Sequence, residues 1–342
     1  MRLGQFTNFS WIIFAERDAD LEDLKLTNHK PLPRVDDQGV IDMHVHVGPE
    51  FIRRRYDPFT LAEEARREGF GVVMKNHFQP TTAWASLATE EDDTVPLVGS
   101  IALNLGCGGI DSHGIRSALS GWKTDTTASE PRSDRFVVWM PTVCAESHLN
   151  QFGRRDMDLN WGVDEKYTTF IDKGEGLQLR DHSGEIIEGL GRALDTIAEH
   201  DLVLASGHLA GPDTQLLVKN AHEAGVRRMI LTHPLWHAIE LSPDQVRDLY
   251  KEYGVYSELC YSNLEMHGID DLTINDYLEV IHAVGPEGVI LSSDCGQTFT
   301  PTIGDSLREF FTLLRQAGIS DDDITQMSVI NPNKLLFGSF GD

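Results

Sequence analysis

The segment VIDMHVHVGP, residues 40–49, decides the fold that we expect for this chain of 342 residues. Its apolar residues form a short run that is typical of a buried strand, and the run ends at His44 and His46. Side chains two positions apart on a strand point to the same face. We therefore expect the two imidazoles to act together at the end of that strand.

Four more short apolar runs end in a polar residue of the same kind. They are GVVMKNH with Lys75, DLVLASGH with His208, RMILTHP with His233 and GVILSSD with Asp294. Imidazole and carboxylate groups are common ligands of divalent metals in proteins. The six residues therefore predict a metal site at the ends of several strands.

The order of the elements predicts the fold class. Apolar runs alternate with helical segments from residue 39 onward, and His208 and His233 are separated by the length of one strand and one helix. This rhythm is typical of a (β/α)8 TIM barrel, in which functional groups gather at the C-terminal ends of the strands. We expect residues 39–342 to form the barrel domain and residues 1–38 to form an N-terminal extension that packs on it.

Two segments interrupt the rhythm. Residues 106–134 and 145–184 are expected to be long loops after strands three and four, and the second contains Phe152, Trp161, Tyr167 and Phe170. Loops of this length are often lids or binding loops, so we expect them to shape a substrate pocket. A contact between subunits or a disordered excursion is the alternative that the sequence leaves open.

Composition narrows the class of protein. The net charge is −25, with 54 acidic and 29 basic residues, which argues against nucleic acid as a partner. No apolar stretch approaches the roughly 20 residues that span a bilayer, so we expect a cytoplasmic protein without a membrane partner. The scattered cysteines indicate no disulfide framework or zinc finger.

An acidic surface with little lysine is what a salt-adapted protein would show, and an ordinary solvated surface is the alternative.

The strand-end residues resemble those of the amidohydrolase superfamily of metal-dependent hydrolases. The resemblance covers roughly residues 38–338 and includes the His-x-His pair, a His after strand five, a His after strand six and an Asp after strand eight. The segment NPNKLLFG, residues 331–338, also looks like the closing helix of that superfamily. The resemblance to this superfamily implies a TIM barrel that binds one or two divalent ions. Zinc is the first expectation, with manganese, iron or cobalt as alternatives.

The chain departs from the superfamily pattern at the bridging lysine. Binuclear members usually carry a carboxylated lysine on strand four, and FVVWMPTVC contains none. Lys75 at the end of strand two is the candidate replacement, because carboxylation would turn a costly buried cation into an anion that bridges two metals. A substrate-binding cation or the partner of a buried ion pair remains the alternative for Lys75.

The resemblance then implies a division of roles. His44, His46 and Asp294 would bind the more buried metal, and His208 and His233 the outer one, with Lys75 between them. Asp294 would also act as the general base. Hydrolysis of an amide, cyclic amide, lactone or similar bond is the first hypothesis. The second is a mononuclear decarboxylase or hydratase in which Lys75 stays a free ammonium, and the third is a metal-binding barrel without activity.

Other residues are candidates for contact with a small-molecule substrate. His77 shares the strand face of Lys75, Arg54 lies in the triplet after strand one, and His237 follows His233 by one helical turn. An arginine near the site can bind the carboxylate of a substrate. The alternative is that the three arginines after strand one are solvated surface charges. Supporting contacts are expected from Glu146, His148 and Glu258. A homo-oligomer is expected by analogy with other barrels of this type.

Overall fold

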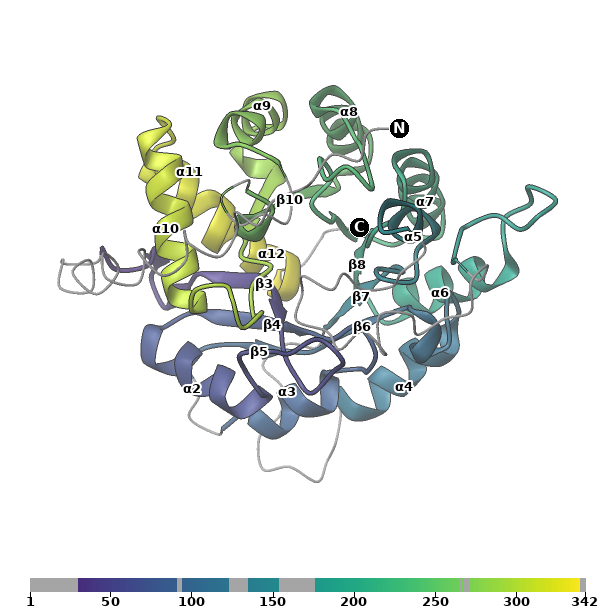
Figure 1. Cartoon of the computed structure of the whole chain (residues 1–342), viewed down its shortest axis with the longest axis horizontal. Coiled ribbons are helices and arrows are strands. Elements are labelled where there is room, and N and C mark those ends of the chain that lie inside the picture. The colour runs from purple at the N-terminus through teal and green to yellow at the C-terminus, as the bar shows by residue number, and fades with distance from the viewer. Residues whose placement is uncertain are drawn as a thin grey trace, which may run out of the picture. The chain divides into compact units, whose positions relative to one another are not determined.

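Parallel strands occupy the centre of the structure, and helices surround them (Figure 1). The computed structural model describes residues 30–90, 94–122, 135–153, 176–264, 266 and 271–338. The first sheet has the order β3-β4-β5, and the second has the order β11-β10-β9-β8-β7-β6. The strands of these two sheets are β3 Ile41–His46, β4 Gly71–Lys75, β5 Leu97–Val98, β6 Ser100–Ala102, β7 Val137–Trp139, β8 Val203–Ala205, β9 Arg228–Leu231, β10 Tyr256–Cys260 and β11 Val289–Ser292.

The two sheets meet at two seams. Beyond β11, Cys295 pairs with Val45 in a parallel bridge, and the His46 amide donates to the Cys295 carbonyl at 2.8 Å. At the other seam Gly99 alone separates β5 from β6, so they count as one interrupted strand. Within the described residues the sheets thus supply the strands of a (β/α)8 barrel, as the sequence predicted.

Gly99 explains the interruption between β5 and β6. A Cβ atom at this position would lie 2.4 Å from the Thr82 Cα atom in helix α3, Thr82–Ala88. Only glycine lets the strand pass the helix backbone at that distance. A small antiparallel pair, β1 Arg34–Val35 and β2 Gln38–Gly39, precedes the barrel.

The remaining helices follow the strands in chain order. They are α2 Pro58–Glu68, α4 Ser112–Trp122, α5 Glu146–Gln151, α6 Glu188–Glu199, α7 Gly211–Glu223, α8 Pro243–Tyr253, α9 Ile274–Val284, α10 Ile303–Gln316, α11 Asp321–Thr325 and α12 Asn331–Phe337. Short 3-10 turns cover Leu105–Cys107, Tyr261–Asn263 and Pro286–Gly288, and one π turn covers Gln326–Ile330. No helix in the described part of the chain combines the length and the apolar character needed to cross a membrane.

Helix α2 shows how local sequence sets these bounds. The Asp57 side chain accepts hydrogen bonds from the Phe59 and Thr60 amides, and Gly69 ends the helix with a φ of 78°. An aspartate before the first turn and a glycine after the last turn are residue types that satisfy the requirements of helix ends.

The C-terminal helix α12 is tied to the strands by a buried arginine. Arg228, the first residue of β9, donates to the carbonyls of Leu335 and Gly338, each at 2.7 Å. Its guanidinium also pairs with the Asp201 carboxylate at 2.9 Å, and Arg135 pairs with the same carboxylate. This network holds α12 beside the start of β9.

The predicted loop over residues 106–134 is wrong in part. Helix α4 occupies Ser112–Trp122, and it buries Ile115, Ala118 and Trp122. These apolar residues recur at helical spacing, and their packing overrides the weak helix propensity of the glycines and serines around them. Residues 123–134 lie outside the described part of the chain.

The predicted loop over residues 145–184 is also shorter than expected. It begins with helix α5, and the described backbone resumes at residue 176. Trp161, Tyr167 and Phe170 fall between these points, outside the described residues. Most of the predicted N-terminal extension, residues 1–29, likewise lies outside them, so its packing on the barrel stays a prediction.

Candidate metal centre

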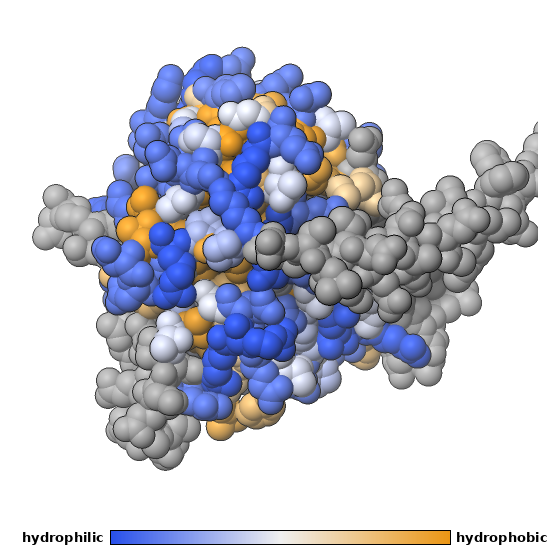
Figure 2. Space-filling view, turned by 90° about the vertical axis from the view of Figure 1, so that its left-hand side faces the viewer, coloured by the Kyte–Doolittle hydropathy of each residue, from blue (hydrophilic) through white to orange (hydrophobic). Residues whose placement is uncertain are grey.

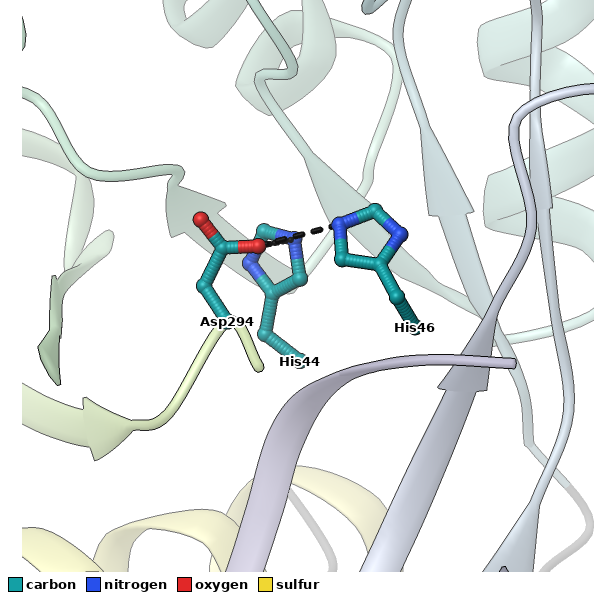
Figure 3. A group of neighbouring side chains, drawn as sticks. All are labelled: His44, His46 and Asp294. Carbon is teal, nitrogen blue, oxygen red and sulfur yellow. Dashed lines mark hydrogen bonds and ion pairs between the residues drawn. The ribbon is translucent and has the colours of Figure 1, made fainter. Parts of the chain in front are cut away.

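Three of the six strand-end residues form a compact group (Figure 3). His44 and His46 project from β3 toward the Asp294 carboxylate, which follows β11. The Asp294 Oδ1 atom lies 3.1 Å from His44 Nε2 and 3.0 Å from His46 Nε2. Asp294 reaches this position through a backbone φ of 52°, a left-handed conformation that is uncommon for a non-glycine residue. The three donor atoms lie within 4.8 Å of one another, as ligands of one ion must.

Glu258 on β10 orients His44 from behind. Its Oε2 atom lies 3.1 Å from His44 Nδ1, and Ser292 donates to Oε1 at 2.8 Å. Burial lowers the pKa of His44 to about 3, so its ring is neutral. The Nδ1 proton then points to the carboxylate and leaves the Nε2 lone pair facing the site. A carboxylate behind a histidine is the usual support of a metal ligand.

Lys75 is buried next to these groups. Its Nζ atom lies 2.7 Å from His44 Nε2 and 4.3 Å from the centre of the Trp139 ring. Burial lowers the pKa of Lys75 to about 8, although the carboxylates of Asp294 and Glu258 oppose the shift. A larger fraction of this amine is therefore neutral near pH 7 than for an ordinary lysine.

His208 and His233 line a cavity that His46, Lys75 and Asp294 also line. Their ring centres are 5.1 Å apart, and His208 Nδ1 lies 2.9 Å from His148 Nδ1 on α5. His233 Nδ1 is buried and has no hydrogen-bond partner among the described residues. Its backbone φ is 24°, so this residue too has a strained conformation. A buried ring nitrogen without a partner is costly unless it binds something else.

The cavity joins these residues into one site. Its volume is about 50 Å³, enough for a few non-hydrogen atoms. It is lined by His46, Ile52, Arg54, Lys75, His77, His208, His233, Trp236, Asn263, Asp294 and Gln297. The structure thus brings five of the six strand-end residues to one cavity, and His44 lies directly beside them.

Two of the three predicted substrate contacts also line this cavity. The Arg54 side chain is 2% exposed, and its Nη2 atom lies 3.0 Å from His46 Nδ1. His77 Nδ1 lies 3.0 Å from the Thr142 hydroxyl. His237 is not among the lining residues and instead lies beside Trp236, with 5.7 Å between ring centres. Its predicted contact with substrate therefore gains no support.

The sequence interpretation missed two residues that line the cavity, Asn263 and Gln297, and one residue that supports its lining, Glu50. Glu50 accepts hydrogen bonds from Arg54 Nε and from the His77 amide. Its spacing of four residues from Arg54 was a usable signal. Asn263 and Gln297 follow strand ends, but uncharged amides are common in loops, and nothing in the sequence singled them out.

The donor set fits a divalent metal. Neutral imidazoles and carboxylates surround a small cavity, Glu258 supports one of the imidazoles, and His233 has an unpartnered ring nitrogen. His44, His46 and Asp294 would hold one ion. His208, His233 and Lys75 line the same cavity.

Comparisons with solved structures returned distant likenesses. One is a putative 2-pyrone-4,6-dicarboxylic acid hydrolase from Pseudomonas putida, with 15% identity over 88% of this chain and 98% of that chain and a TM-score of 0.45. Another is an organophosphate-hydrolysing protein engineered from a weak promiscuous lactonase template, with 14% identity, coverage of 86% and 95%, and a TM-score of 0.49. A third is an amidohydrolase from Burkholderia multivorans, with 12% identity, coverage of 86% and 98%, and a TM-score of 0.43.

Because these TM-scores lie below 0.5, the barrel assignment rests on the strand pairing of the chain itself. No curated protein matches the sequence. A family model matches residues 39–258, which is more than half of the chain and includes His44, His46, Lys75, His208 and His233. The chain therefore belongs to the family described as a family of unknown function, DUF6282.

Proposed function

We propose that this protein is a metal-dependent hydrolase of the amidohydrolase type, acting on an amide, cyclic amide, lactone or similar bond. One observation carries the proposal. His44, His46 and Asp294 bring three ligand atoms within 4.8 Å of one another, beside a cavity that His208, His233 and Lys75 also line. A core that needed only packing would not bury so many polar groups around one space.

The proposed metals are one or two divalent ions, with zinc first and manganese, iron or cobalt as alternatives. A bound ion would lower the pKa of water and polarise the bond to be cleaved. Asp294 would receive the proton of the attacking water; its carboxylate lines the cavity and lies beside both ligand imidazoles, which supports this role. Ile52 and Trp236 supply apolar walls that limit the access of bulk water.

Lys75 would complete a two-metal site after carboxylation. The neutral amine attacks CO2, a nitrogen–carbon bond forms, and a proton leaves to solvent. The lowered pKa of Lys75 favours this step, because only the neutral amine is a nucleophile. The product would be an anion beside His44, and it would replace a buried ammonium.

Metal content tests this proposal. The protein is prepared with bicarbonate and mixed divalent metals, and the wild type is compared with Lys75→Ala by elemental analysis. We expect two ions per chain in the wild type and one or none in the variant. Lys219→Ala, on the helix α7, is a matched control that should keep both ions. A wild-type protein that holds no metal would refute the proposal.

A mononuclear decarboxylase or hydratase is the second candidate. The negative charges of Asp294 and Glu258 favour it, because they stabilise Lys75 as an ammonium, which then has no need of carboxylation. One ion per chain, unchanged in Lys75→Ala, would make this candidate the better one and would assign Lys75 to the substrate.

A further inference from the structure

Arg54 is the one cationic side chain besides Lys75 that lines the described cavity. Its side chain is 2% exposed, so it is not a solvated surface charge. An antiparallel bridge between Arg54 and Gln297 fixes the backbone of its loop against the segment that follows Asp294. The guanidinium is therefore held at the site rather than free to swing into water.

The guanidinium still has unused donors. Arginine carries five N–H groups. Among the described residues Arg54 makes two side-chain hydrogen-bond contacts, from Nε to Glu50 and between Nη2 and His46 Nδ1. Its Nη1 atom and the second hydrogen of Nη2 have no partner there. These donors form the end of the planar group, which can bind both oxygens of a carboxylate.

Two amide side chains in the same cavity each have an oxygen atom without a hydrogen-bond partner among the described residues. The Asn263 side chain lines the cavity, and its Oδ1 atom is buried without a hydrogen bond among the described residues. Gln297 donates from Nε2 to the Asp294 carbonyl at 3.2 Å, which fixes the orientation of its amide. Its Oε1 atom is likewise buried without a partner. Buried acceptors of this kind require a donor, such as an N–H or O–H group.

We propose that the substrate is a small carboxylic acid that carries an N–H or O–H donor, with Arg54 binding the carboxylate and Asn263 and Gln297 accepting from the donor. This inference rests on the proposed function, since the scissile bond must lie at the ligands of the metal. The volume of about 50 Å³ limits the bound portion to a few non-hydrogen atoms.

A matched pair of probes tests the proposal. N-acetylglycine carries a carboxylate and an N–H donor, and N-acetylglycinamide has the same shape without the charge. Binding of each to the zinc-loaded protein is measured by calorimetry. We expect the acid to bind about tenfold to a hundredfold more tightly than the amide, as a charge-assisted hydrogen bond provides.

Variants of Arg54 then test whether this residue causes the preference for the acid over the amide. Arg54→Gln should bind both probes equally, and Arg54→Lys should keep a reduced preference, because it retains the charge without the planar fork. Arg55→Gln is the matched control. Arg55 donates to the Thr298 carbonyl at 3.2 Å and does not line the cavity, so this variant should retain the full preference.

Metal content is measured on each sample to separate the two proposals. Equal binding of the probes by a wild type that holds its metal would overturn the carboxylate proposal and leave the hydrolase proposal standing. A preference that survives in Arg54→Gln would overturn it too, because the metal would then bind the carboxylate directly. Absence of metal from the wild type would instead refute the proposed function.

Discussion

Glu258 decides which nitrogen of the His44 ring faces the cavity. The carboxylate accepts the Nδ1 proton, and Ser292 holds the carboxylate in place. A ring fixed in this tautomer offers Nε2 to a metal without rearrangement. The contribution of Glu258 is therefore to prepare a ligand, although it does not line the cavity itself.

Replacement of Glu258 by Gln should weaken metal binding about tenfold to a hundredfold, as loss of such a supporting carboxylate does. The affinity is measured by competition with a chelator. Glu279→Gln, an exposed position on α9, is the control and should bind metal as the wild type does. Unchanged affinity in the Glu258 variant would mean that packing alone orients His44.

Replacement of Asp294 by Asn should keep metal and lose turnover. The amide oxygen can still act as a ligand, but it cannot accept a proton, so we expect kcat to fall by about a hundredfold to ten-thousandfold. Turnover on any substrate found for the wild type is compared at equal metal content. Activity near that of the wild type would remove Asp294 from the role of base.

Arg228 is one of the residues that attach helix α12 to the barrel. Arg228 is buried at the start of β9 and donates to carbonyls at the end of the helix. Asp201 balances its charge. A buried cation at the C-terminal end of a helix donates hydrogen bonds to the last carbonyls. Its charge also interacts favourably with the negative end of the helix dipole.

Arg228→Met should therefore destabilise the protein by about 3 kcal/mol, because several carbonyl hydrogen bonds and one ion pair are lost together. Chemical denaturation measures the change. Arg227→Met, at the exposed neighbouring position, should leave stability within about 0.5 kcal/mol. Equal stability of the two variants would contradict this account of α12.

Acid should weaken the same attachment. Partial burial raises the pKa of Asp201. Hydrogen bonds from Arg228 and Arg135 lower the pKa by a larger amount, so it lies below its usual value of 3.8. A lowered pKa stabilises the fold above about pH 4, and the stabilisation is lost as the pH falls below that value. Asp201→Asn should thus flatten the decline of melting temperature between about pH 4 and pH 2. An unchanged slope would exclude this carboxylate as a source of acid sensitivity.

The sequence predicted those elements whose signal is local. His44 and His46 share a strand face by simple alternation, and the ends of α2 follow from Asp57 and Gly69. Helix α4 was missed because its burial depends on partners distant in the chain. Asn263 and Gln297 were missed for the same reason, since only the folded barrel shows that they line one cavity.

The whole molecule carries a strong negative charge. The face in Figure 2 is largely hydrophilic, with small scattered apolar patches, and the chain has a net charge of −25. Like charges on one surface repel one another and oppose the compact state. Salt screens this repulsion, and the screening length falls to about 3 Å at 1 M.

The melting temperature should accordingly fall when the protein is moved from molar potassium chloride to low salt. Thermal unfolding followed by circular dichroism over a series of salt concentrations measures the effect. Sucrose at equal osmolality is the control, because it does not screen charge. A melting temperature that is the same at both ends of the series would refute salt adaptation.

The left-handed backbone at His233 and Asp294 has a consequence for protein engineering. Their φ angles of 24° and 52° correspond to a left-handed backbone, which glycine or asparagine adopts at a lower energetic cost. Selection for heat resistance alone would therefore favour exchange of these two side chains, and any gain would come at the expense of the proposed site. A thermostable form of this protein is best sought by holding both positions constant and varying the remainder of the barrel.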